Sequence, residues 1–220
     1  MNDKQLTECR NLLIAGCTAM QINLSIDQQE LLLRYTQELY KWNKAYNLTA
    51  IRNPEAMLKL HVLDSLSVVK NLAKLKPKRI IDVGTGGGLP GIILAIMWPE
   101  VKVDLLDTNG KKTRFLNQCK HNLGLTNVLV LNKRVEQHQP DQAYDIVTSR
   151  AFASISDMLA GCEQLVGKEG VFAAMKGQYP QAELDAMSES YDLLDSSALS
   201  VPGVDAIRHL LLIKKTIVKY

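Results

Sequence analysis

The chain has 220 residues, of which 46% are hydrophobic and 22% are charged. This composition is typical of a globular protein that can bury a core, either as one large domain or as one domain with an extension. No segment approaches the roughly 18 consecutive apolar residues that a membrane span needs, and the polar N-terminus does not resemble a signal peptide. We therefore expect a cytoplasmic protein without a membrane partner.

The net charge of +3 is weakly basic, which is compatible with an RNA partner without proving one. Basic residues form local clusters at 74–79, 111–114 and 133–134. The four cysteines and the four histidines are scattered, without the spacing that metal ligands show. We expect no metal and no disulfide framework.

Residues 1–75 are predicted to form a helical N-terminal extension that packs on the rest of the chain. Helices are expected at 4–20, at 25–46 and at 54–72, with residues 47–54 as a loop. Ser25 and Gln28 have the spacing of a capping box, and Pro54 is a favoured first-turn residue.

Residues 76–220 alternate between short strands and helices. Such alternation predicts an α/β fold with a mostly parallel, Rossmann-like sheet that is covered on both faces. No helix pattern separates the last two strands, so an antiparallel hairpin is expected at one edge. The predicted strands are 79–83, 101–107, 127–132, 144–149, 170–176, 191–199 and 208–215, and the predicted helices are 89–98, 111–124, 154–165 and 180–190.

A glycine-rich loop, Gly84 to Gly91, follows the first predicted strand. In such sheets ligands bind beyond the carboxyl ends of the strands, and glycines let the backbone approach them closely. A Walker loop is excluded because the segment ends Leu89-Pro90-Gly91 instead of Gly-Lys-Ser/Thr. A dinucleotide and S-adenosylmethionine (SAM) remain.

Two acidic residues bear on that choice. Asp82 precedes the loop, where an acid suits a ligand with a cationic group such as the amine and sulfonium of SAM. Asp107 ends the second strand, where a carboxylate can accept both ribose hydroxyls of either ligand. The combination of Asp82, Gly84, Gly86 and Asp107 favours SAM.

The loops after the third and fourth strands complete the predicted cofactor site. Val135 is placed to contact an adenine through its apolar side chain, and Glu136 or a neighbouring amide to hydrogen-bond the edge of the base. Ser149, Arg150 and Phe152 are expected at the mouth of the pocket.

Motifs that this sequence lacks limit the kinds of methyl acceptor that can be expected. The fourth strand is not followed by the Asn/Asp-Pro-Pro-aromatic loop that is common in enzymes acting on exocyclic amines. Cys162, inside a predicted helix, is poorly placed to be the nucleophile that methylation at pyrimidine carbon five needs. A guanine N7 carries a lone pair and no proton, so its methylation needs alignment but no general base. The sequence permits that chemistry, and small-molecule acceptors could leave a similar pattern.

Five segments together resemble the RsmG/GidB family, the bacterial guanine-N7 methyltransferases of 16S ribosomal RNA. The resemblance covers nearly the whole chain, and its motifs are specific in combination. It implies a Rossmann-like SAM-dependent fold, SAM as cofactor, and one guanine near the decoding region of the small ribosomal subunit as substrate. We also expect a monomer without a DNA partner. The segments are WNKAYNLTAIRNPEAMLKLHVLDSL (42–66), IDVGTGGGLPGI (81–92), LLDTNGKKTRFL (105–116), SRAFAS (149–154) and MKGQ (175–178).

The resemblance also implies roles for individual residues. Gly84 and Leu89 would contact SAM, as would Arg150 at the end of the fourth strand, and Asp107 would take the ribose. No acid–base pair is required, and positioning is assigned to Arg150, Arg134 and Lys176. The RNA-contacting residues are predicted to be Lys111, Lys112, Arg114, Arg134, Arg150 and Lys176. The family more often has arginine where this chain has Lys112, which weakens a bidentate phosphate contact.

Two alternatives stay open. The first is a SAM- or NAD-dependent enzyme that acts on a small molecule. The second is a ribosome-associated module that binds SAM without catalysis. RNA binding should weaken steeply with salt, whereas a small-molecule enzyme should depend on salt much less.

Overall fold

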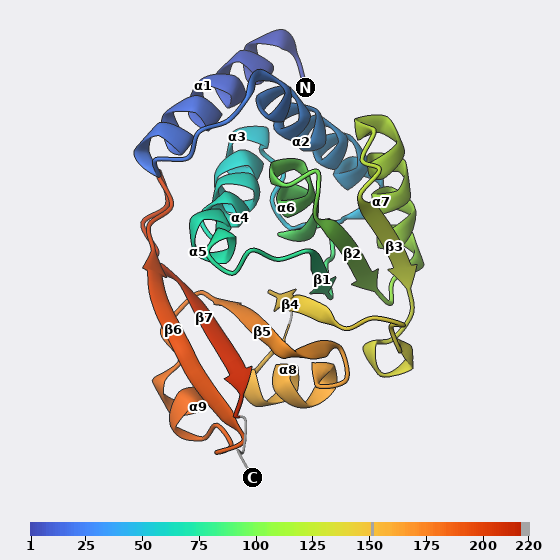
Figure 1. Ribbon diagram of the computed structural model, residues 1–220. Helices are drawn as coiled ribbons and strands as arrows, with labels where there is room; N and C mark the ends of the chain where they lie inside the picture. The colour runs from blue at the N-terminus through green and yellow to red at the C-terminus, as the bar shows by residue number, and fades with distance from the viewer. Residues whose placement is uncertain (151, 217–220) are drawn as a thin grey trace.

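The computed structural model describes residues 1–150 and 152–216. Seven strands form one sheet in the order β3-β2-β1-β4-β5-β7-β6 (Figure 1). Strands β1 to β5 pair in parallel, whereas β7 is antiparallel to both β5 and β6. The predicted parallel sheet with an antiparallel edge hairpin is therefore confirmed. The strands are β1 (Arg79–Val83), β2 (Lys102–Asp107), β3 (Val128–Asn132), β4 (Tyr144–Ser149), β5 (Val166–Lys176), β6 (Tyr191–Leu199) and β7 (Arg208–Lys215).

Helices cover both faces of this sheet (Figure 1). One face carries α6 (Gly91–Met97) and α7 (Gly110–Leu123) together with the N-terminal helices, and the other carries α8 (Ile155–Cys162) and α9 (Gln181–Asp185). Among the described residues, no helix is both long enough and apolar enough to cross a bilayer.

The N-terminal helices pack on the sheet through a continuous apolar core. Helix α1 (Asp3–Ala19) begins with a capping box, and α2 (Ile26–Tyr46) begins with the predicted capping box of Ser25 and Gln28. The buried Leu32 and Leu39 of α2 belong to the same cluster as the residues of α6 and α7. The division of the chain at residues 75 and 76 remains a prediction, although one core spans both parts.

The third N-terminal helix differs from its prediction. Instead of one helix over 54–72, the chain forms four short pieces. A π-helix spaces its hydrogen bonds five residues apart instead of four, and it therefore shifts which side chains share a face. The apolar spacing of the sequence does not reveal this shift. The pieces are α3 (Pro54–Met57), the π-helix η1 (Leu58–Leu63), α4 (Asp64–Leu66) and α5 (Val69–Ala73).

Other boundaries also differ from the predictions, including α6, which covers Gly91–Met97 of the predicted 89–98, and α8, which ends at Cys162 instead of residue 165. Strand β5 begins at Val166 instead of residue 170, and α9 covers only Gln181–Asp185 of the predicted 180–190. A short 3-10 helix, η2 (Val135–Gln137), follows β3. Neither the shifted ends nor this additional turn changes the sheet topology.

The start of α6 is packed too tightly for any side chain at Gly91. A Cβ added there would lie 2.2 Å from Leu105 Cδ2 and 2.9 Å from Asp82 Oδ2. We expect Gly91→Ala to lower the free energy of unfolding by at least about 2 kcal/mol, because the core must shift to accept the methyl group. Gly177→Ala is the control, since its Cβ would meet nothing within 4 Å. Urea unfolding that gives the same stability for both variants would contradict this packing.

Candidate functional site

The glycine-rich loop joins β1 to α6 and is held from below by Asp82. The carboxylate oxygen Oδ2 accepts hydrogen bonds from Thr85 Oγ1 at 2.6 Å and from the Gly91 amide at 2.8 Å. Asp82 is completely buried, and burial raises its pKa to about 6. These hydrogen bonds fix the two ends of the loop to Asp82. The structure therefore does not place Asp82 at a pocket surface, and the predicted cofactor contact of Asp82 is replaced by a structural role.

Helix α2 supports the same loop from the other side. The buried Tyr35 donates a hydrogen bond of 2.7 Å from its hydroxyl to the carbonyl of Gly87. In sequence, Tyr35 reads as one apolar position of an amphipathic helix. The N-terminal helices therefore help to shape the loop.

The first pocket, called the nucleoside pocket, lies where β1, β2 and β4 end. It has a volume of about 330 Å³. Of the residues predicted to bind the cofactor, Gly84, Asp107, Val135 and Glu136 line it together. Its lining residues are Val83, Gly84, Leu106, Asp107, Thr108, Lys112, Arg134, Val135, Glu136 and Phe152.

Asp107 is fixed at the edge of this pocket. Its Oδ2 accepts the Gly86 amide at 2.9 Å, and its Oδ1 accepts the Asn109 amide at 2.8 Å. Each carboxylate oxygen has a second lone pair, so the side chain can still accept two hydroxyl groups. This geometry suits a ribose.

The basic residues near this pocket are divided. Lys112 lies 3.6 Å from Asp107 Oδ2 and lines the nucleoside pocket with Arg134, so the structure places it beside the predicted ribose position. Lys111 and Arg114 are exposed on α7 and are not among the residues that line this pocket. RNA contact by these four residues stays a prediction.

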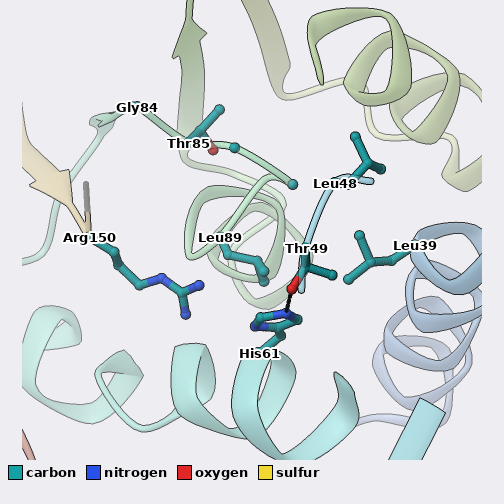
Figure 2. A pocket seen from close by; sticks show the side chains of 10 residues that line it. Leu39, Leu48, Thr49, His61, Gly84, Thr85, Leu89 and Arg150 are labelled. Atoms are coloured by element: carbon teal, nitrogen blue, oxygen red, sulfur yellow. Dashed lines mark hydrogen bonds between the residues drawn. The ribbon is translucent and has the colours of Figure 1, made fainter. Parts of the chain in front are cut away.

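The second pocket, called the central pocket, meets the nucleoside pocket at Gly84 and has a volume of about 200 Å³. Figure 2 shows the guanidinium of Arg150 pointing across it toward Leu89 and His61. Its lining residues are Leu39, Leu48, Thr49, His61, Gly84, Thr85, Gly86, Gly87, Leu89 and Arg150.

His61 is a neutral, fully engaged side chain at the floor of the central pocket. Its Nε2 lies 2.8 Å from Thr49 Oγ1 and its Nδ1 lies 3.1 Å from the carbonyl of Leu60. Burial, and then the nearby charge of Arg150, lower its pKa to about 4. His61 is therefore unprotonated at neutral pH.

The third pocket, called the outer pocket, meets the central pocket at His61 and Arg150 and has a volume of about 320 Å³. Asp64 accepts Arg150 Nη1 at 2.8 Å and Arg208 Nε at 3.1 Å in its wall. The outer pocket is lined by Ile51, Leu60, His61, Asp64, Arg150, Met175, Lys176, Gly177 and Arg208.

Lys176 lines the outer pocket, but its ammonium group is occupied within the protein. Its Nζ contacts both carboxylate oxygens of Glu183, at 2.8 and 3.1 Å, and the carbonyl of Ala153 at 3.3 Å. The RNA contact predicted for Lys176 would compete with these partners.

Sequence reasoning missed the contributions of Thr49, His61, Asp64 and Arg208 to these pockets. Three of them come from the N-terminal part, and His61 belongs to the π-helix, so no regular spacing marks them. Ser149, predicted at the pocket mouth, is buried and donates to the Val83 carbonyl at 2.7 Å. One position of the 149–154 segment, residue 151, lies outside the described residues.

The residues present fit SAM. A Cβ at Gly86, where φ is +61°, would have no neighbour nearer than 3.9 Å, so this part of the loop leaves open space for a ligand. Asp107 offers acceptors for a ribose, and Val83, Leu106 and Phe152 supply apolar surface for a base. The central pocket adjoins this surface at Gly84 and would take the methionine end of SAM.

Comparisons with solved structures identify the fold. A putative O-methyltransferase from Klebsiella pneumoniae superposes with a TM-score of 0.61 at 12% identity, over 93% of this chain and 97% of that one. A SAM-dependent methyltransferase from Thiobacillus denitrificans, solved with S-adenosyl-L-homocysteine, gives 0.53 at 10% identity, over 69% and 91%. These likenesses show that the chain has the Rossmann-like α/β fold of class I methyltransferases.

Sequence similarity identifies the family. The family model described as "rRNA small subunit methyltransferase G" (GidB) matches residues 28–211. A relative named ribosomal RNA small subunit methyltransferase G, from Alteromonas mediterranea, is 47% identical over 94% of this chain and 97% of its own length. The chain belongs to the GidB family, and the predicted family resemblance is confirmed.

The buried, neutral His61 predicts how stability depends on pH. Its pKa is about 4 in the folded state, whereas the ordinary pKa of a histidine side chain is 6.5. Between these values the unfolded chain binds more protons, so stability falls as the pH falls from 6.5 toward 4. We expect the wild-type protein to lose about 3 kcal/mol more than His61→Gln over this range, measured by urea unfolding.

Asp82 has the opposite effect on how stability depends on pH. For this reason the wild-type protein must be compared with the His61→Gln variant. The raised pKa of Asp82 means that the folded state binds the proton more tightly, so its contribution falls as the pH rises from 3.8 to about 6. Asp82 is common to both proteins, so the difference between their curves isolates His61. Parallel curves would contradict the neutral, buried state of His61.

Proposed function

We propose that this protein transfers the methyl group of SAM to N7 of one guanine in 16S ribosomal RNA, near the decoding region of the small subunit. Membership of the GidB family supports the RNA substrate. The work would take place in the cytoplasm on the small ribosomal subunit or its RNA.

One observation on the site carries the proposal for N7. Among the described residues, one acid and one histidine line the central and outer pockets, and both are already engaged. His61 has partners at both ring nitrogens, and Asp64 is held by Arg150 and Arg208. Among the described lining residues, no group is therefore free to remove a proton. Methylation of an exocyclic amine or a ribose hydroxyl requires a proton to leave, whereas N7 has none to lose.

The chain's own residues would act by binding and orientation. When bound, SAM supplies an electrophilic methyl group on its sulfonium. Asp107 would hold the ribose, and Gly84 and Leu89 would shape the path between the nucleoside pocket and the central pocket. Arg150, at the boundary with the outer pocket, would orient the acceptor, which is catalysis by proximity.

Transfer of labelled methyl from SAM tests this function. The acceptors are small-subunit RNA and intact small subunits from cells that lack this gene, with large-subunit RNA as the control. We expect label in small-subunit RNA only. Label in neither form of the small subunit, from protein that binds SAM, would overturn the RNA assignment and direct the search to small molecules.

A further inference from the structure

Arg208 is a residue of the outer pocket whose hydrogen-bonding capacity is largely unused. It comes from the start of β7, far in sequence from the other pocket residues. Its single partner among the described residues is Asp64, which it contacts through Nε at 3.1 Å. An arginine has five N–H donors. The two terminal nitrogens of Arg208, which form the fork that matches a phosphate, therefore remain available.

Asp64 holds this guanidinium at a fixed place in the outer pocket, which adjoins the central pocket. Its side chain is only 8% exposed, and its two oxygens bind Arg208 and Arg150 separately. The side chains of the two arginines are 27% and 26% exposed, so both reach solvent in the pocket. Because Arg150 also lines the central pocket, Asp64 ties Arg208 to the boundary between the two pockets.

The charges of the outer pocket leave room for one anion. Lys176 is neutralised by Glu183, and Asp64 offsets one of the two arginines. His61 is neutral at neutral pH because its pKa is lowered to about 4. Counted together with Glu183, the described lining residues therefore carry one positive charge in excess, which matches a single phosphodiester group.

We propose that Arg208 binds a phosphodiester of the acceptor RNA next to the target nucleotide, and that Asp64 is the positioning residue that aims Arg208 and Arg150. This inference rests on the proposed function, because it requires an RNA acceptor. The apolar side chains of Ile51, Leu60 and Met175 line the same pocket and would face the nucleoside that the phosphate carries.

Equilibrium binding of small-subunit RNA tests the role of Arg208. Arg208→Ala should weaken RNA binding about tenfold or more and reduce the slope of log affinity against log salt by about one. SAM affinity should change less than about twofold. Retained SAM binding also shows that the variant is folded. Lys102→Ala is the matched control. It removes one exposed positive charge from the start of β2, whereas the pockets lie at the other end of that strand. Arg208→Ala that binds RNA like this control would overturn the proposal.

Asp64→Asn separates positioning from simple neutralisation of charge. The substitution keeps the shape of the side chain and makes the pocket more positive. If Asp64 positions the arginines, RNA binding weakens despite the added charge, and KM for RNA rises while SAM affinity is retained. If Asp64 only neutralises charge, RNA binding tightens and the salt slope grows, which contradicts the positioning role.

The two proposals fail in different ways. Wild-type protein that transfers no methyl group to RNA would remove the proposed function. Wild-type protein that methylates RNA, with Arg208→Ala indistinguishable from Lys102→Ala in RNA affinity and salt slope, would remove only the assignment of Arg208.

Discussion

Replacing Asp107 by alanine is expected to weaken SAM binding about 100-fold, because the carboxylate would accept two ribose hydroxyls through charge-assisted hydrogen bonds. The same carboxylate accepts the Gly86 and Asn109 amides, so its loss also loosens the glycine-rich loop. Isothermal titration of SAM into the purified variant measures the effect directly.

Two further variants make the Asp107 result interpretable. Asp107→Asn keeps the shape and one acceptor oxygen, and we expect an intermediate loss. Asp192→Ala removes an exposed acid from β6, on the hairpin edge, and should bind SAM like the wild-type protein. Unchanged affinity in a folded Asp107→Ala variant would show that the cofactor ribose lies elsewhere.

Replacing Arg150 by alanine is expected to lower kcat for methyl transfer about 100-fold, since this guanidinium spans the central and outer pockets and would orient the acceptor. The variant also removes one cation from Asp64, so thermal unfolding should be measured alongside the single-turnover rate.

Arg150→Lys is the conservative comparison. A lysine retains the charge but has no planar fork, so it cannot hold Asp64 and a second group in fixed directions. We expect Arg150→Lys to recover part of the rate of methyl transfer, but not the fixed orientation of the acceptor. An Arg150→Ala variant within about threefold of the wild-type rate would exclude a positioning role, because positioning effects of this kind are much larger.

The sheet could be predicted because its pattern is local. Each strand of the parallel part is a short apolar run, and the glycine-rich loop and Asp107 lie at strand ends where the fold brings them together. The nucleoside pocket therefore gathers Gly84, Asp107, Val135 and Glu136, as the sequence predicts.

The outer pocket could not be predicted because its parts are distant in sequence and share no spacing. Asp64 follows a π-helix, and Arg208 begins the last strand. Their contact depends on how the N-terminal helices pack against the sheet. Asp82 is a case in which the sequence predicted a contact that the structure does not show. Its position in the motif suggested a ligand contact, whereas burial and two hydrogen bonds give it a structural role in the loop.

The chemistry of the labelled nucleoside tests the central claim most directly. RNA labelled by the wild-type protein is digested to nucleosides and compared with methylated standards, and borohydride and aniline cleavage then maps the position. A single N7-methylguanosine in small-subunit RNA is the predicted result. Label in a ribose 2′-hydroxyl or in an exocyclic amine would contradict the proposed function, because those acceptors need a base that the described residues of the central and outer pockets do not offer.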